Sequence, residues 1–211
     1  YAERAVPGNA ARAAEAWADI SRREPANFEA AWKFARVCYF LGERAPARDQ
    51  RGYIEQGIAA GERARRLMPL RPEGHFWAAA NMGALAERFG MRAGLKYRKP
   101  IREALETVLR LDPSFMQGSA DRALGRYYHK VPGVLGGSRT LAEQHLRASL
   151  AYDPRSTVSL YFLAELLIDA RRTAEARTVL QQVLDAPLNP EWVPEDEDFK
   201  HKAAARLTSL R

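Results

Sequence analysis

The sequence has almost no cysteine, and it lacks the local motifs of most enzymes. Its single cysteine, Cys38, excludes an internal disulfide and supplies no thiolate cluster for zinc. The four histidines, His75, His129, His145 and His201, form no His-Glu-x-x-His pair, so we expect no metal site. No Gly-x-Ser-x-Gly elbow, dinucleotide-binding fingerprint or catalytic Cys-His signature is present. We therefore expect a protein that is not an enzyme and needs no cofactor.

A long apolar run is also missing. The longest apolar stretches, such as 159–170, contain acidic residues and are shorter than the roughly 20 residues needed to cross a bilayer. No secretory leader is visible, because Tyr1 opens a polar, alanine-rich segment, although a processed chain would look the same. With 211 residues, of which 46% are hydrophobic and 28% charged, the chain fits one globular domain or one elongated repeat array.

Acidic residues are in the minority. The chain has 27 arginines and 6 lysines against 26 acidic residues, which gives a formal net charge of +7. Such an excess raises the question of nucleic acid or of acidic partners. The basic residues are spread along the chain, however, and the aromatic residues follow a helical spacing and do not alternate with basic ones. We therefore expect no nucleic-acid binding.

One glycine-rich stretch, KVPGVLGGS at 130–138, invites comparison with phosphate-binding loops. Such loops follow a strand and end in a lysine and a serine or threonine. No lysine follows Gly133 here, so we interpret the stretch as an enlarged connector between two helices. Pro132 would end the first helix, and Ser138 or Thr140 would cap the second.

What the sequence does contain is an internal repeat. Four helix-like segments end at Pro25, Pro69, Pro113 and Pro154, at spacings of 44, 44 and 41 residues, and a looser ending at Pro187 follows after another 33. Proline ends such segments because it cannot extend an α-helix and restrains the residue before it. A period of this length is typical of stacked helix pairs.

Small and apolar residues recur on one face of each helix in these units. In the second helices, spacings of four and three residues place Gly57, Gly61 and Ala64, for example, on one face. The first helices share a spacing of zero, three, four and seven, as in Asp121, Leu124, Gly125 and Tyr128. This pattern resembles the tetratricopeptide repeat (TPR). We predict an all-α fold, a solenoid of antiparallel helix pairs with about four to five units and a C-terminal capping helix.

The predicted units divide a single domain of residues 1–211. They are 1–25 (partial), 26–69, 70–113, 114–154 and 155–187, followed by a capping helix over 194–211. The long units need explanation, since repeats of this kind have about 34 residues. We expect a polar loop over 41–53 and a helix over 72–88. Gly90 and Gly94 then break the pattern, and Pro100 marks the first turn of a new helix.

The third and fourth units together resemble a narrower family, the T-component (TatT) of tripartite ATP-independent periplasmic (TRAP) transporters. Four features carry the resemblance over roughly 72–186: the aromatic, alanine-rich helix 77–83, a glycine-broken connection, the Leu-Gly-x-x-Tyr helix 124–128 and the Pro-Gly and Gly-Gly loop 132–137. The resemblance implies a non-enzymatic periplasmic protein, frequently a lipoprotein, that can associate as a homotrimer. The lipid-bearing cysteine would lie in a segment outside this sequence.

The same resemblance implies a partner and a cargo. Members are thought to pair with a periplasmic substrate-binding protein and to help move a small hydrophobic or carboxylate ligand. A generic scaffold, which grips a peptide or protein partner in its concave groove, is the alternative. The candidate ligand-binding residues lie in first helices and do not serve the repeat consensus: Phe76, Trp77, Asn81, Tyr127 and Tyr161, with Arg36 and Arg126 near the rim.

Three further residues are expected to be structural. Glu165 is the only acid deep in an apolar run, and we expect it to form an ion pair with Arg122 or Arg126. Cys38 is expected in the core, and His145 is expected to pack or to have a satisfied hydrogen bond.

Overall fold

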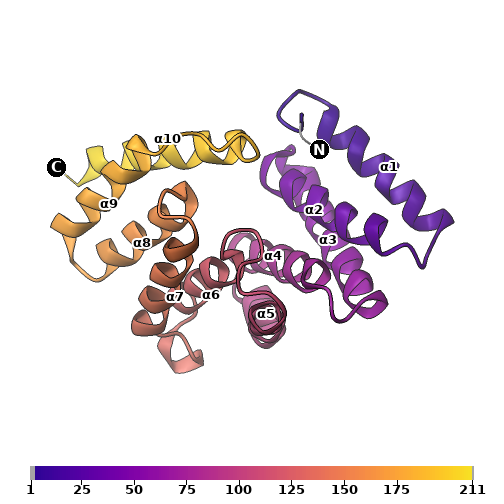
Figure 1. Cartoon of the computed structure of the whole chain (residues 1–211), viewed down its shortest axis with the longest axis horizontal. Coiled ribbons are helices and arrows are strands. Elements are labelled where there is room, and N and C mark those ends of the chain that lie inside the picture. Colours follow the sequence, from indigo (N-terminus) through magenta and orange to yellow (C-terminus); the bar gives the residue numbers. More distant parts are fainter. Residues whose placement is uncertain (1–2, 211) are drawn as a thin grey trace. The chain divides into compact units, whose positions relative to one another are not determined.

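The structure, a computed structural model, describes residues 3–210 (Figure 1). Within these residues it contains ten α-helices, one short 3-10 helix and no strand. The predicted all-α class of antiparallel helix pairs is therefore confirmed. The helices form two compact units that divide between Pro113 and Ser114, the end of the third predicted repeat. Whether the whole chain acts as one domain stays a prediction.

Unit 1, the part up to Pro113, is a succession of helices in which each packs against the next. The helices are α1 (Asn9–Arg23), α2 (Phe28–Arg44), α3 (Ala47–Leu67), α4 (Pro72–Arg88) and α5 (Met91–Leu111). The first helices of neighbouring repeats, α2 and α4, also pack against each other. Cys38 is fully buried here, as predicted, and burial raises the pKa of its thiol to about 12.

Glycines allow α3 and α4 to approach closely. A Cβ added to Gly61 would lie 2.6 Å from the backbone nitrogen of Ala78, and one added to Gly57 would lie 2.2 Å from Oδ1 of Asn81. Backbone at Ala78 cannot move aside as the end of a flexible side chain can. The small residues predicted on this face of α3 are therefore required by the helix contact.

Unit 2, from Ser114 onwards, repeats the same arrangement. Its helices are α6 (Ser119–Lys130), the 3-10 helix η1 (Gly133–Leu135), α7 (Arg139–Tyr152), α8 (Thr157–Asp169), α9 (Thr173–Asp185) and α10 (Val193–Ser209). Consecutive helices pack together, and α8 also packs against both α6 and α10. Leu146, Leu167 and Leu180 are fully buried between them and form the centre of the core.

The glycine-rich stretch is a compact connector, as predicted. Helix α6 ends at Lys130, and the backbone N–H of Gly137 donates to the carbonyl of Pro132 at 3.1 Å. A Cβ at Gly137 would lie 1.7 Å from the carbonyl oxygen of Val131, so only glycine fits this turn. The Ser138 hydroxyl then accepts from the N–H of Leu141 and caps α7.

The acidic C-terminal segment forms the first turn of the capping helix. Helix α10 begins at Val193 with Pro194 in its first turn, where Glu195 and Asp196 place negative charge at the positive helix end. Buried Asp196 accepts from the hydroxyl of Thr157 at 2.5 Å and from the N–H of Asn189 at 2.7 Å. These bonds fasten the capping helix to α8.

Two predictions about the connections were wrong. The segment 41–53 is not a polar loop, because α2 continues to Arg44 and α3 begins at Ala47; its polar residues form the solvent faces of two helices that bury Leu41 and Ile54. Pro100 does not begin a helix but lies inside α5, which starts after Gly90, at φ +89°. A proline costs a helix one backbone hydrogen bond, and the packed second half of α5 offsets that loss.

No helix in residues 3–210 has both the length and the apolar character needed to span a bilayer.

Candidate functional site

The seven predicted site residues fall into two groups, one in each unit. Unit 1 holds Arg36 on α2 and Phe76, Trp77 and Asn81 on α4. The Arg36 guanidinium lies 5.9 Å from the centre of the Trp77 ring, and the rings of Phe76 and Trp77 meet edge to face at 5.1 Å. Phe76, Trp77 and Asn81 are buried in the helix core, so their part in a ligand site stays a prediction.

Asn81 has a clear packing role. Its side-chain amide donates to the carbonyl of Ala35 on α2 at 3.0 Å and to the carbonyl of Trp77 at 2.8 Å. The side chain is fully buried, and its Oδ1 lies against Gly57 of α3. This one amide therefore links three helices of unit 1.

In unit 2, Arg126 and Tyr161 come together around a carboxylate. Arg126 on α6 forms an ion pair with Glu165 on α8, as predicted, and Arg206 on α10 lies 3.9 Å from the other oxygen of Glu165. Tyr161 is one helical turn before Glu165 on the same helix. We call Arg126, Tyr161, Glu165 and Arg206 the Glu165 cluster. Two first helices, α6 and α8, and the capping helix α10 contribute to it.

The Glu165 cluster has a net positive charge, and its side chains differ in their exposure to solvent. The side chains of Arg126 and Glu165 are 19% and 14% exposed, whereas that of Arg206 is 46% exposed. The Arg126 guanidinium also lies 4.5 Å from the centre of the Phe162 ring. Two guanidinium groups flank a single carboxylate, so the cluster favours a further anion.

Tyr161 and Tyr127 are both largely buried. Burial, reinforced by the Glu165 carboxylate, raises the pKa of Tyr161, so its phenol remains a hydrogen-bond donor at neutral pH. The Tyr127 ring meets that of Tyr128 edge to face at 5.2 Å. Tyr128 in turn stacks on His145, whose Nδ1 lies 2.7 Å from Asp121, as expected of a satisfied histidine.

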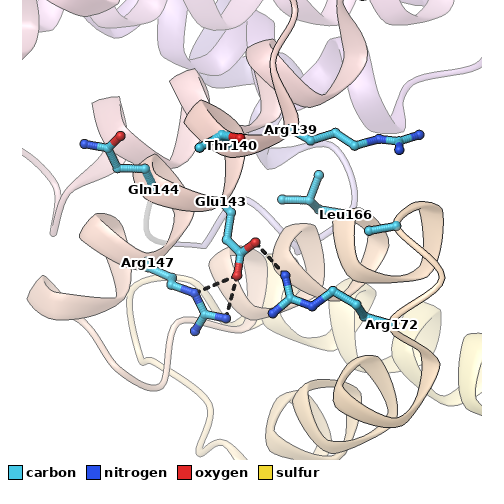
Figure 2. Close-up of a pocket in the computed structure, with 8 residues that line it drawn as sticks. Arg139, Thr140, Glu143, Gln144, Arg147, Leu166 and Arg172 are labelled. Atoms are coloured by element: carbon cyan, nitrogen blue, oxygen red, sulfur yellow. Dashed lines mark hydrogen bonds and ion pairs between the residues drawn. The ribbon is translucent and has the colours of Figure 1, made fainter.

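A pocket of about 410 Å³ lies between α7 and the start of α9 (Figure 2), and the sequence interpretation missed it. Glu143 and Glu175 alternate with Arg147 and Arg172 in a closed ring of ion pairs, at 2.6 to 2.9 Å. The hydrogen bond from Arg172 is the main cause that lowers the pKa of Glu143. The pocket is lined by Arg139, Thr140, Glu143, Gln144, Arg147, Leu166, Ala170 and Arg172.

The two carboxylates of the ring neutralise the two guanidinium groups, so we interpret the ring as a structural contact between the second helices of neighbouring repeats. The two pairs that join the helices, Arg147 with Glu175 and Arg172 with Glu143, are 28 and 29 positions apart in the sequence. That separation is close to the length of one repeat and was the signal by which they could have been found. Among residues 3–210, no group of three or more histidine, cysteine, aspartate or glutamate side chains is placed to hold a metal ion.

Helix pairs with small residues at their crossings define the TPR-like proteins, and solved structures agree. The crystal structure of TTC0263, a thermophilic TPR protein in Thermus thermophilus, is similar with a TM-score of 0.71 at 21% identity, over 95% of this chain and 92% of that one. The crystal structure of MamA is similar with a TM-score of 0.57 at 14% identity, over 95% of each chain. At these identities the likeness shows the fold alone. No curated protein matches.

Two family models match the sequence. The TRAP transporter T-component matches residues 73–197, and the regulator of microtubule dynamics protein 1-3 matches residues 6–133. Each match covers more than half of the chain, which therefore belongs to the TRAP transporter T-component family and shares its N-terminal repeats with the regulator of microtubule dynamics family. The first match contains the whole pocket and all of the Glu165 cluster except Arg206.

Proposed function

We propose that the chain is a non-enzymatic accessory protein of a TRAP-type transport system in the periplasm. It docks the substrate-binding protein through the Glu165 cluster. The observation that carries this proposal is that two predicted site residues, Arg126 and Tyr161, converge with Glu165 inside the region matched by the T-component family.

The chemistry of the cluster suits an acidic group of the partner. Glu165 and the Phe162 ring hold the Arg126 guanidinium in place, so little side-chain entropy is lost when a second carboxylate binds. Arg206 is the more exposed of the two arginines and would meet the partner first. The protonated phenol of Tyr161 offers a neutral donor beside them.

A small ligand belongs to the same proposal. A hydrophobic carboxylate could place its charge at Arg36 of unit 1, and the buried side chains of Phe76 and Trp77 would have to move apart to admit its apolar part. A thermal-shift screen of small carboxylates and lipids, repeated with Trp77→Ala, tests this role. Loss of the shift in the variant supports it; no shift with any compound counts against it.

Docking is tested by biolayer interferometry between the full chain and a substrate-binding protein of a TRAP system. Arg206→Glu puts a second negative charge next to Glu165 from an exposed position, so we expect the affinity to fall about tenfold or more. Arg155→Glu is the matched control, because it makes the same charge change at an exposed position of unit 2 outside the cluster. Equal loss in both variants, or in neither, would overturn the assignment of the cluster.

A second candidate is a general scaffold that binds an acidic protein segment. The match to the regulator of microtubule dynamics family and the net charge of +7 favour it. Binding of an acidic peptide that is lost on charge reversal at Arg36 would support this scaffold.

Sedimentation equilibrium of the full chain tests the homotrimer, and detection of a lipid-modified precursor tests the anchor.

A further inference from the structure

The first half of α5 carries charge of one sign. Residues 91–102 contain five basic and no acidic residues: Arg92, Lys96, Arg98, Lys99 and Arg102. None of residues 92–100 is buried, whereas Ile101, Leu105 and Val108 in the second half are. Packing therefore explains the second half of α5 and leaves the composition of the first half unexplained.

Three of these basic residues share one helical face with a leucine. Arg92, Leu95, Lys96 and Lys99 follow the spacing zero, three, four and seven, and all four are exposed, Leu95 to 52%. We call them the α5 basic face. In residues 3–210, no carboxylate pairs with Arg92 or Lys96; Lys96 lies 4.8 Å from the centre of the Tyr97 ring, and Lys99 lies 3.6 Å from Glu103.

We propose that the α5 basic face docks on an anionic lipid surface. Its guanidinium and ammonium groups bind the phosphates of the headgroups, and Leu95 enters the boundary between headgroups and acyl chains. Interfacial helices combine a basic face with exposed aliphatic and aromatic side chains in this way. An acidic protein would neutralise the same cations but would leave Leu95 without a role, so the exposed leucine favours lipid.

The expected binding is weak and reversible. Each lysine or arginine near an anionic surface contributes about a fivefold increase in partition coefficient at low salt, and the contribution is screened by added salt. A single short face of three cations and one leucine thus holds the chain at a membrane only transiently, unless a second membrane-binding element, such as a covalent lipid, is also present.

Co-sedimentation of the full chain with vesicles tests the proposal. Vesicles of phosphatidylglycerol and phosphatidylcholine should bind the chain, and pure phosphatidylcholine should not. Arg92→Gln with Lys96→Gln should lower the partition coefficient about 25-fold, the product of two fivefold losses. The matched control, Arg48→Gln with Arg66→Gln, removes the same charge from exposed positions of α3 in the same unit and should bind like the unaltered chain. Circular dichroism checks that each variant is folded.

A third variant separates lipid from an acidic protein partner. Leu95→Ser leaves the charge unchanged and should weaken binding to the vesicles severalfold. It should not alter any binding to soluble polyglutamate, which has no apolar boundary. The proposal is overturned if the control pair loses as much binding as the α5 pair, if Leu95→Ser binds vesicles normally, or if polyglutamate binds more tightly than the anionic vesicles.

Discussion

At the scale of the residue, Asn81 shows how a polar group in the core can specify a helix arrangement. The sequence places it among the candidate ligand-binding residues of the first helices. The structure gives it hydrogen bonds to α2 and α4 and a contact with α3. Its two donor bonds go to backbone carbonyls and give the side chain a packing role, whereas its buried Oδ1 has no hydrogen-bond partner among the described residues.

We expect Asn81→Ala to lower the free energy of unfolding by about 1–3 kcal/mol, because the buried Ala35 carbonyl loses its donor. Urea unfolding followed by circular dichroism measures the change. The control is Asn9→Ala, in which only bonds of the exposed N-terminal segment are lost and little change is expected. A stable Asn81→Ala protein that no longer binds ligand would instead assign Asn81 to a ligand site.

His129 should make unit 2 sensitive to pH. Burial lowers the pKa of His129 below its ordinary value of 6.5, and the bond to Asp169 opposes this shift only in part. As the pH falls, His129 therefore becomes protonated at a higher pH in the unfolded chain than in the folded chain. Stability is therefore fully present above about pH 6.5 and declines as the pH falls through that value towards the folded pKa.

The measurement is the free energy of unfolding at several points between about pH 7.5 and about pH 5.5. We expect the unaltered chain to lose more stability over this interval than His129→Gln does, since glutamine does not titrate. The carboxyl groups of Glu29, Glu143 and Glu175 have lowered pKa values, so they change stability only below about pH 4.5, outside this interval. Parallel curves for the two proteins would contradict this role of His129.

At the scale of the element, close helix contacts depend on glycine at particular positions. Gly61→Ala should destabilise the protein by about 1–3 kcal/mol, because the added methyl group meets the backbone of Ala78. Gly52→Ala in the same helix meets no atom within 4 Å and should stabilise the protein by about 0.5–1 kcal/mol through helix propensity. Chemical denaturation of the two variants gives both values, and effects of the same sign would refute the role of Gly61.

The helix pairs were predictable from the sequence because their signals are local. Terminal prolines and small residues at fixed spacing placed α4 at 72–88 correctly. The connections were less predictable. A glycine or a proline inside a helix costs free energy, but packing elsewhere along the helix can offset that cost, so neither residue reliably marks the end of a helix. Thus α5 passes through Gly94 and Pro100, and the polar residues of 41–53 lie on helices.

At the scale of the whole molecule, each unit assembles its own group of functional candidates. The sequence identified Arg126 and Tyr161, because aromatic and basic residues outside the repeat consensus stand out. It did not identify Arg206, or the ring of ion pairs beside the pocket, because these charged residues lie on partly exposed helix faces, where charge is expected without a special partner. Charges on helix surfaces have many potential partners, and only the packing of the repeats selects among them.

Docking of the substrate-binding protein at the Glu165 cluster of unit 2 is tested by hydrogen exchange of the full chain, measured with and without that protein. We expect slower exchange in α6, α8 and α10, which carry Arg126, Glu165 and Arg206. Slower exchange confined to α7 and α9, or no change in any helix of unit 2, would contradict it.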